Sequence, residues 1–167
     1  QEMMEAEKKR TQEEARKKTE QDGMMAQEQA KTQKTNQVHE DRVKAFYTLF
    51  KEAYEERNDS QIISMLSDKW QANDGSTLSD LQMNLRRTFK MFDEVKYNIQ
   101  NLSMQLVGSG NGYSNYLVSY DVTITSRIYK RNLKHEEKSS INEEVTIEGS
   151  GNPKISKTLG GRFWYVQ

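Results

Sequence analysis

The longest regular pattern in the chain is an alternation of apolar and polar residues from Tyr116 to Ile128. Even-numbered positions carry mostly bulky apolar or aromatic side chains, and odd-numbered positions are mostly polar. Because neighbouring side chains of a strand point to opposite faces, this pattern predicts one long strand with a buried face and a solvated face. Mean strands have about five to six residues, so a strand of this length is expected to bend around a core.

Helical patterns precede this strand. Apolar residues recur at helical spacing from Val43 to Tyr54, which predicts a helix with a broad apolar face. A short second helix is expected next, with Ser60 as its N-cap. Thr77 and Asp80 then form a threonine-x-x-acid pattern that is typical of a helix start, and it predicts a third helix.

Period-two patterns lie on both sides of the long strand. The alternation over residues 95–106 changes phase near residues 100–101, which predicts a bulge. Residues 141–147 and 155–166 predict two more strands, each preceded by a turn. Three helices followed by four antiparallel strands predict an α+β domain, a cone-shaped curved sheet with the helices packed on one face.

The first 42 residues follow neither pattern. They are rich in Glu, Gln, Lys, Ala and Met, and they contain no proline and one glycine. These are good helix formers, so we expect a long polar helical arm or spacer over residues 1–42, followed by a domain over residues 43–167. No hydrophobic heptad is sustained, which argues against a strong autonomous coiled coil.

Composition excludes several function classes. The net charge is zero, so no global basic field favours nucleic acid. The absence of cysteine excludes disulfides, thiolate metal sites and cysteine nucleophiles. No apolar run reaches the roughly 20 residues of a membrane span, although a start at Gln1 is compatible with removal of a signal or anchor.

The order of elements and several short motifs resemble the nuclear transport factor 2-like (SnoaL-like) superfamily over about residues 40–167. The matching segments are Phe46-Tyr47-x-x-Phe50-x-x-Ala53-Tyr54-Glu55-x-Arg57-Asn58, Met65-Leu66-Ser67-x-x-Trp70, Asp74-Gly75 and Gly160-Gly161-Arg162-Phe163-Trp164. The resemblance implies a cone-shaped half-barrel with a pocket between sheet and helices. Members of the superfamily include isomerases, dehydratases, hydrolases, transport factors and noncatalytic binding modules, so the fold alone does not decide the chemistry.

A set of aromatic residues provides the candidate pocket. One interpretation is plain core; the other is a cavity in which tyrosine hydroxyls and tryptophan edges orient a small apolar, planar or lipid-like ligand. The candidate pocket residues are Tyr47, Phe50, Tyr54, Trp70, Tyr97, Tyr116, Tyr120 and Trp164.

Acid–base candidates are few. Asp121 is the carboxylate within the long strand, but it belongs to the odd-numbered phase and is expected to face outward. His39 lies in the polar arm and His135 in a charged stretch, so neither is surrounded by apolar residues. We therefore assign no catalytic residue, no metal site and no cofactor, and keep Asp121 as the alternative acid or base.

The sequence favours a noncatalytic binding or assembly module, in the periplasm or cell envelope, with a cytoplasmic location as the alternative. The alternative function is a small-molecule isomerase, dehydratase or hydrolase that uses the tyrosine-lined pocket. A protein partner or self-association through the arm or the outer sheet face is expected, with no nucleic acid. Because that face carries mainly polar residues, an arm-assisted or weak dimer is favoured over a tight one.

Overall fold

The computed structural model describes residues 2–167, which form two compact units that divide between Asp41 and Arg42. Helix α1, Glu2–Glu55, contributes to both units. In the first unit the side chains of residues 3–35 are all exposed, and ion pairs one turn apart, such as Arg16–Glu20 at 3.1 Å, line the helix. Such exposed pairs contribute only a few tenths of a kcal/mol each, so this unit has no apolar core of its own.

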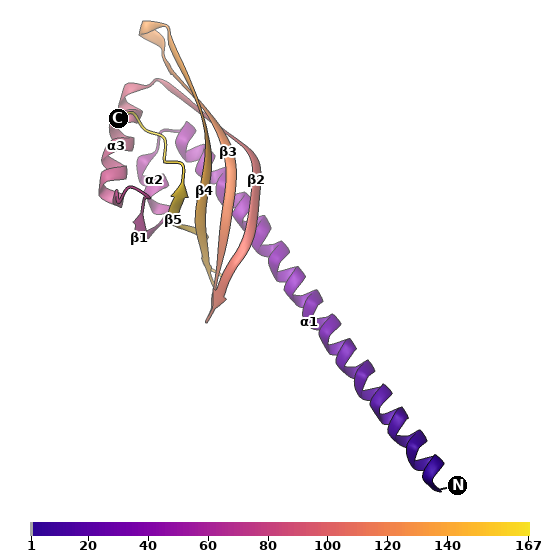
Figure 1. Ribbon diagram of the computed structural model, residues 1–167. Helices are drawn as coiled ribbons and strands as arrows, with labels where there is room; N and C mark the ends of the chain where they lie inside the picture. The colour runs from indigo at the N-terminus through magenta and orange to yellow at the C-terminus, as the bar shows by residue number, and fades with distance from the viewer. Residues whose placement is uncertain (1) are drawn as a thin grey trace. The chain divides into compact units, whose positions relative to one another are not determined.

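The second unit is built on a curved five-stranded sheet (Figure 1). The strand order is β1-β5-β4-β3-β2; β1 runs parallel to β5, and every other neighbouring pair is antiparallel. The strands are β1 (Leu66–Gln71), β2 (Glu94–Gly110), β3 (Tyr113–Ile128), β4 (Leu133–Glu148) and β5 (Lys154–Gly160). A 3₁₀ turn, Tyr129–Arg131, joins β3 to β4.

Helices cover one face of this sheet. The last turns of α1 bury Val43, Phe50 and Tyr54 completely. Helices α2 (Asp59–Ser64) and α3 (Leu78–Met91) lie on the same side of the sheet (Figure 1). The capping box predicted at Thr77 and Asp80 is present at the start of α3. The predicted α+β architecture is therefore confirmed.

The long strand is also as predicted. In β3 the even-numbered residues from Tyr116 to Ser126 are buried, and the odd-numbered ones are exposed or half-buried. The β2–β3 register shifts between Gln100 and Ser103, and Asn101 has a φ of +56°, so the predicted bulge is confirmed.

Strand boundaries differ from the prediction in two places. The last strand ends at Gly160 rather than Val166, because Gly161 has a φ of +73° and turns the chain away from β4. A Cβ at Gly161 would lie 2.6 Å from the Ser140 carbonyl oxygen. Strand β4 begins at Leu133 rather than near Ile141, because its charged first half pairs residue by residue with the end of β3.

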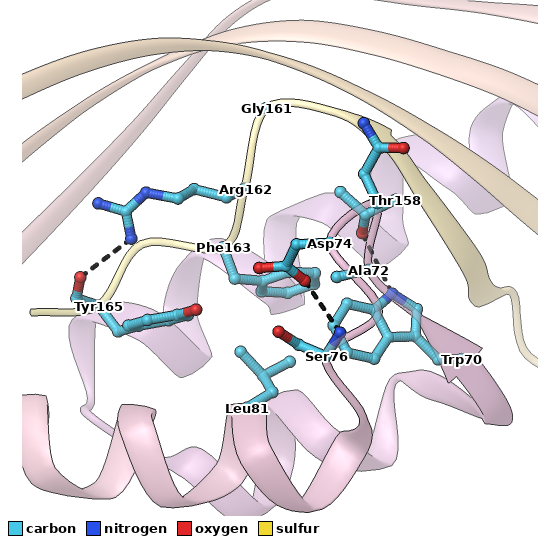
Figure 2. Close-up of a pocket in the computed structure, with 11 residues that line it drawn as sticks. Trp70, Ala72, Asp74, Ser76, Leu81, Thr158, Gly161, Arg162, Phe163 and Tyr165 are labelled. Carbon is cyan, nitrogen blue, oxygen red and sulfur yellow. Dashed lines mark hydrogen bonds between the residues drawn. The ribbon is translucent and has the colours of Figure 1, made fainter. Parts of the chain in front are cut away.

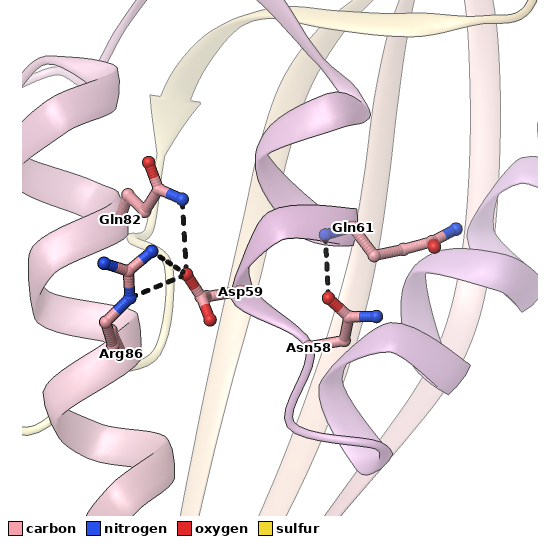
Figure 3. Close-up of polar contacts among 5 residues, drawn as sticks. All are labelled: Asn58, Asp59, Gln61, Gln82 and Arg86. Carbon is pink, nitrogen blue, oxygen red and sulfur yellow. Dashed lines mark hydrogen bonds and ion pairs between the residues drawn. The ribbon is translucent and has the colours of Figure 1, made fainter.

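The N-cap of α2 also differs from the prediction. Asn58, not Ser60, caps the helix, and its side-chain oxygen accepts a hydrogen bond from the Gln61 amide. Asp59 then holds α2 against α3 (Figure 3): its carboxylate lies 3.1 Å from Arg86 Nη2 and accepts from Gln82 at 3.3 Å. These contacts fix the helices that flank the site described next.

Candidate functional site

The interior of the curved sheet is filled with aromatic side chains. Tyr47 packs edge-on against Tyr120 with ring centroids 5.1 Å apart, and Tyr54 stacks on Tyr97 at 4.4 Å. Phe50 contacts the rings of both Tyr54 and Tyr97. These rings therefore pack against one another in the interior, and a ligand-binding role for them stays a prediction.

The remaining predicted pocket residues are buried as well. Tyr116 faces the core from β3, and Trp164 packs on Phe92 with ring centroids 5.6 Å apart. The Trp164 carbonyl oxygen accepts a hydrogen bond from the Tyr54 hydroxyl at 3.3 Å. Of the eight predicted pocket residues, Trp70 is the one that also lines the cavity described below.

Glu143 on β4 is the functional candidate that sequence reasoning missed. It is 2 % exposed, and its two carboxyl oxygens accept hydrogen bonds from Tyr47 at 2.5 Å and from Tyr120 at 3.2 Å. The signal was present in the sequence, because Glu143 occupies the same alternating phase as Ile141 and Val145. A charged residue in an otherwise apolar phase of a strand is a buried carboxyl candidate.

Burial controls the protonation of this cluster. It raises the pKa of Glu143 to about 7, although the hydrogen bonds from Tyr47 and Tyr120 act in the opposite direction. Burial, and secondarily the Glu143 carboxylate, raises the pKa of the Tyr47 and Tyr120 hydroxyls well above the ordinary value. The two tyrosines therefore stay neutral hydrogen-bond donors while Glu143 titrates near neutral pH.

A cavity of about 320 Å³ lies between the β1–α3 loop, α3 and the segment after β5 (Figure 2). The Phe163 ring forms part of its wall and packs edge-on against Trp70, with ring centroids 5.4 Å apart. Phe163 also contacts Phe50, which joins the wall to the aromatic core. We call this cavity the Trp70 pocket; it is lined by Trp70, Ala72, Asn73, Asp74, Ser76, Leu81, Thr158, Gly161, Arg162, Phe163 and Tyr165.

Polar groups of both charges lie on the lining of the Trp70 pocket. The Asp74 carboxylate accepts a hydrogen bond from the Ser76 amide at 2.9 Å, and hydrogen bonds from Ser76 lower the pKa of Asp74. The Arg162 guanidinium lies 5.2 Å from the centre of the Tyr165 ring and donates to the Tyr165 carbonyl oxygen at 3.2 Å (Figure 2). The pocket thus combines aromatic walls with one anion and one cation.

Thr158 connects the Trp70 pocket to the buried carboxyl. Its hydroxyl oxygen accepts a hydrogen bond from Trp70 Nε1 at 3.1 Å, which fixes the indole. Thr158 is also the cross-strand partner of Glu143 in the β4–β5 pairing. Paired residues of adjacent strands lie on the same face, so the pocket wall and the carboxyl are neighbours on the concave side of the sheet.

The other acid–base candidates lie elsewhere. Asp121 is exposed, and its carboxylate accepts hydrogen bonds from Asn101 at 3.0 Å and from Ser140 at 2.7 Å. These bonds lower its pKa. His135 is also exposed, on β4, so the structure does not bring Asp121 or His135 into the buried cluster of Glu143. His39 belongs to the first unit.

Within residues 2–167, no group of three or more His, Cys, Asp or Glu side chains is arranged to hold a metal ion. Over the same residues, no helix has the length and apolar character needed to cross a membrane.

Comparisons with known proteins identify the fold. No family model matches the chain, and no curated protein matches its sequence. A proposed scytalone dehydratase from Novosphingobium aromaticivorans matches with a TM-score of 0.66 at 13% identity, over 80% of this chain and 93% of that one. A hexachlorocyclohexane dehydrochlorinase from Novosphingobium barchaimii matches with a TM-score of 0.57 at 14% identity, over 78% and 90% of the two chains.

A third similar structure has a different role. The helical cell shape determining protein Pgp2 of Campylobacter jejuni matches with a TM-score of 0.58 at 13% identity, over 69% of this chain and 38% of that one. At these identities the likeness concerns the fold and not the activity. The chain has the nuclear transport factor 2-like, or SnoaL-like, fold, as the sequence motifs predicted.

Proposed function

We propose that residues 42–167 bind a small, flat and largely apolar molecule in the Trp70 pocket. The observation that carries this proposal is a cavity of about 320 Å³ with aromatic walls and a few converging polar groups. Ligand sites in proteins are typically concave, mostly apolar and supplied with a small number of fixed polar contacts.

The hydrogen bonding of Thr158 indicates the ligand's polarity. Its hydroxyl oxygen accepts from Trp70 Nε1, and among residues 2–167 this hydroxyl donates to no other group. A hydroxyl group has one hydrogen to donate, so a ligand with an acceptor such as a carbonyl oxygen would complete the site. A flat ring between Trp70 and Phe163, with an acceptor near Thr158, fits this arrangement.

A fragment screen tests the binding proposal. Flat aromatic fragments with a carbonyl group should bind the wild-type protein in ligand-observed NMR. Ala72→Phe, which fills the cavity, should abolish binding. Met83→Phe is the matched control, because Met83 is 66% exposed on α3 and does not line the pocket. Fragments that bind Ala72→Phe as well as wild type would refute the proposal.

A second candidate function is acid–base catalysis on the bound molecule. Glu143 favours it, because a carboxyl with a pKa of about 7 can take up or release a proton at neutral pH. The structural similarity to a proposed dehydratase and a dehydrochlorinase also favours a small-molecule enzyme over a purely noncatalytic assembly role. Glu143 itself does not line the Trp70 pocket, so proton transfer would require a rearrangement of the wall near Thr158.

Glu143→Gln separates the two candidates. A catalytic Glu143 predicts that the variant binds the same fragments but loses turnover of any substrate built on them. Retained turnover in Glu143→Gln would exclude the catalytic role and leave the binding function in place.

The helical arm adds an association role to the proposal. Residues 3–35 expose their side chains, which leaves them free to contact another chain. The expected partner is a protein, or a second copy, in the periplasm or cell envelope. Deleting residues 1–35 should leave the domain folded and reduce the number of chains per particle in light scattering. An unchanged oligomeric state would contradict the role of the arm.

A further inference from the structure

A second concave site lies between the end of α1, α2 and the turn before β5. The cleft has a volume of about 310 Å³. Its lining includes the buried side chains of Phe46, Met65 and Pro153 and the half-exposed side chain of Leu49. An apolar side chain at the edge of an apolar cleft marks a surface that can bind an apolar group.

Two cations also line this cleft, and the structure holds both in place. Arg42 Nη1 donates to the Gly149 carbonyl oxygen at 3.3 Å, and Lys154 Nζ donates to the Ser64 carbonyl oxygen at 2.8 Å. The described residues that line the cleft include no aspartate or glutamate. The charge of the lining is therefore positive and is not neutralised within it.

The charge and the apolar surface are arranged in order along α1. Arg42, Phe46 and Leu49 are spaced by four and three residues, so they lie on one face of the helix. From Arg42 to Leu49 the helix advances about 10 Å. Along α1, the lining of the cleft thus changes from the cationic Arg42 to the apolar Leu49.

We propose that this cleft is a second binding site, separate from the Trp70 pocket, for an amphipathic anion: a carboxylate on a short alkyl chain. The carboxylate lies toward Arg42 and Lys154, where charge-assisted hydrogen bonds are strongest. The alkyl chain of the ligand lies over Phe46 and extends toward Leu49. Contact with the half-exposed Leu49 side chain removes apolar surface from water.

Three probes of equal chain length test the charge requirement. Octanoate, octanol and octyltrimethylammonium are titrated separately into the full chain, below their micelle concentrations, and followed by NMR. Octanoate should bind, with shifts at the residues of the cleft, and the neutral and cationic probes should bind at least about tenfold more weakly. Equal binding of all three probes, or no binding of octanoate, would overturn the proposal.

Variants of the cleft test its location. Arg42→Gln, Lys154→Gln and Leu49→Asn should each weaken octanoate binding by about tenfold. Lys90→Gln and Leu159→Asn are the matched controls, because both residues are exposed and neither lines the cleft. Thermal melting of each variant verifies that it is folded. Octanoate binding that survives the cleft variants but is lost in Ala72→Phe would place the ligand in the Trp70 pocket and refute a second site.

Discussion

Asp121 and Glu143 lie on the neighbouring strands β3 and β4, and each carboxyl accepts hydrogen bonds from two side chains. Their pKa values nevertheless move in opposite directions. Hydrogen bonds lower the pKa of the exposed Asp121, whereas burial raises the pKa of Glu143 to about 7. Two hydrogen bonds therefore stabilise an exposed carboxylate but do not offset the loss of water around a buried one.

The difference follows from the alternation of the strands. Asp121 occupies the odd-numbered, outward phase of β3, and Glu143 occupies the inward phase of β4 beside Ile141 and Val145. Within residues 2–167, burial and two tyrosine hydrogen bonds set the pKa of Glu143, without a neighbouring cation. The hydrogen bonds from the neutral Tyr47 and Tyr120 favour the carboxylate but do not offset burial, so the protonated form is retained to a higher pH.

Replacing each carboxyl residue by alanine should give the largest difference in the free energy of unfolding between the two sites. Glu143→Ala leaves a cavity and two buried tyrosine hydroxyls without their acceptor, so the free energy of unfolding should fall by about 3 kcal/mol. Asp121→Ala removes hydrogen bonds that water can replace, so its loss of stability should be much smaller. Urea unfolding at pH 5.5 measures both values, and equal losses would remove the distinction between the two sites.

The change of stability with pH should be nearly as large as the loss expected for Glu143→Ala. Between pH 4.5, the ordinary pKa of a glutamate, and about 7, the folded state keeps the Glu143 proton while the unfolded state loses it. The folded state then binds more protons, so stability falls as the pH rises through this window, by about 3 kcal/mol in total. Glu143→Gln should remove this fall in urea unfolding measured at several pH values.

Asp121 is the control, because its pKa shift has the opposite sign to that of Glu143. Its pKa is lowered in the folded state, so its contribution is present above the ordinary value of 3.8 and is lost as the pH falls below it. Asp121→Asn should therefore leave the fall between pH 4.5 and 7 unchanged. A fall that disappears in Asp121→Asn and persists in Glu143→Gln would reverse the assignment.

Removal of single hydroxyls should have the smallest effect. Tyr47→Phe and Tyr120→Phe should each destabilise the domain by about 1 kcal/mol and raise the pKa of Glu143 further, because a donor to its carboxylate is lost. Tyr129→Phe is the control, since the exposed Tyr129 donates its hydroxyl to the half-buried carboxylate of Glu94 at 2.8 Å. A loss in Tyr129→Phe as large as in Tyr47→Phe would show that burial does not set the strength of these bonds.

Much of the fold could be predicted because it depends on local periodicity. The alternation in β3, the phase change near Asn101 and the Thr77–Asp80 cap are all local signals, and each appears in the structure. The end of the last strand was predicted wrongly, since it depends on Gly161 meeting the Ser140 carbonyl across the sheet. That contact joins residues that are distant in sequence.

The candidate site was harder to predict than the fold. The tyrosines were identified as inward-facing, but whether their rings fill the interior depends on packing between elements rather than on sequence spacing. The Trp70 pocket combines a loop, a helix and the chain after β5, so no single motif encodes it. Glu143 was the one residue that the alternation of β4 could have revealed.

The most direct test of the account is the pKa of Glu143 itself. The side-chain carboxyl carbons of ¹³C-labelled glutamate can be followed by NMR during a pH titration, with Glu143 assigned by its absence in Glu143→Gln. We predict a pKa of about 7 for this carboxyl. A pKa at or below the ordinary value of 4.5 would show that the tyrosine hydrogen bonds outweigh burial, and it would contradict the assignment of Glu143 as a carboxyl that stays protonated up to neutral pH.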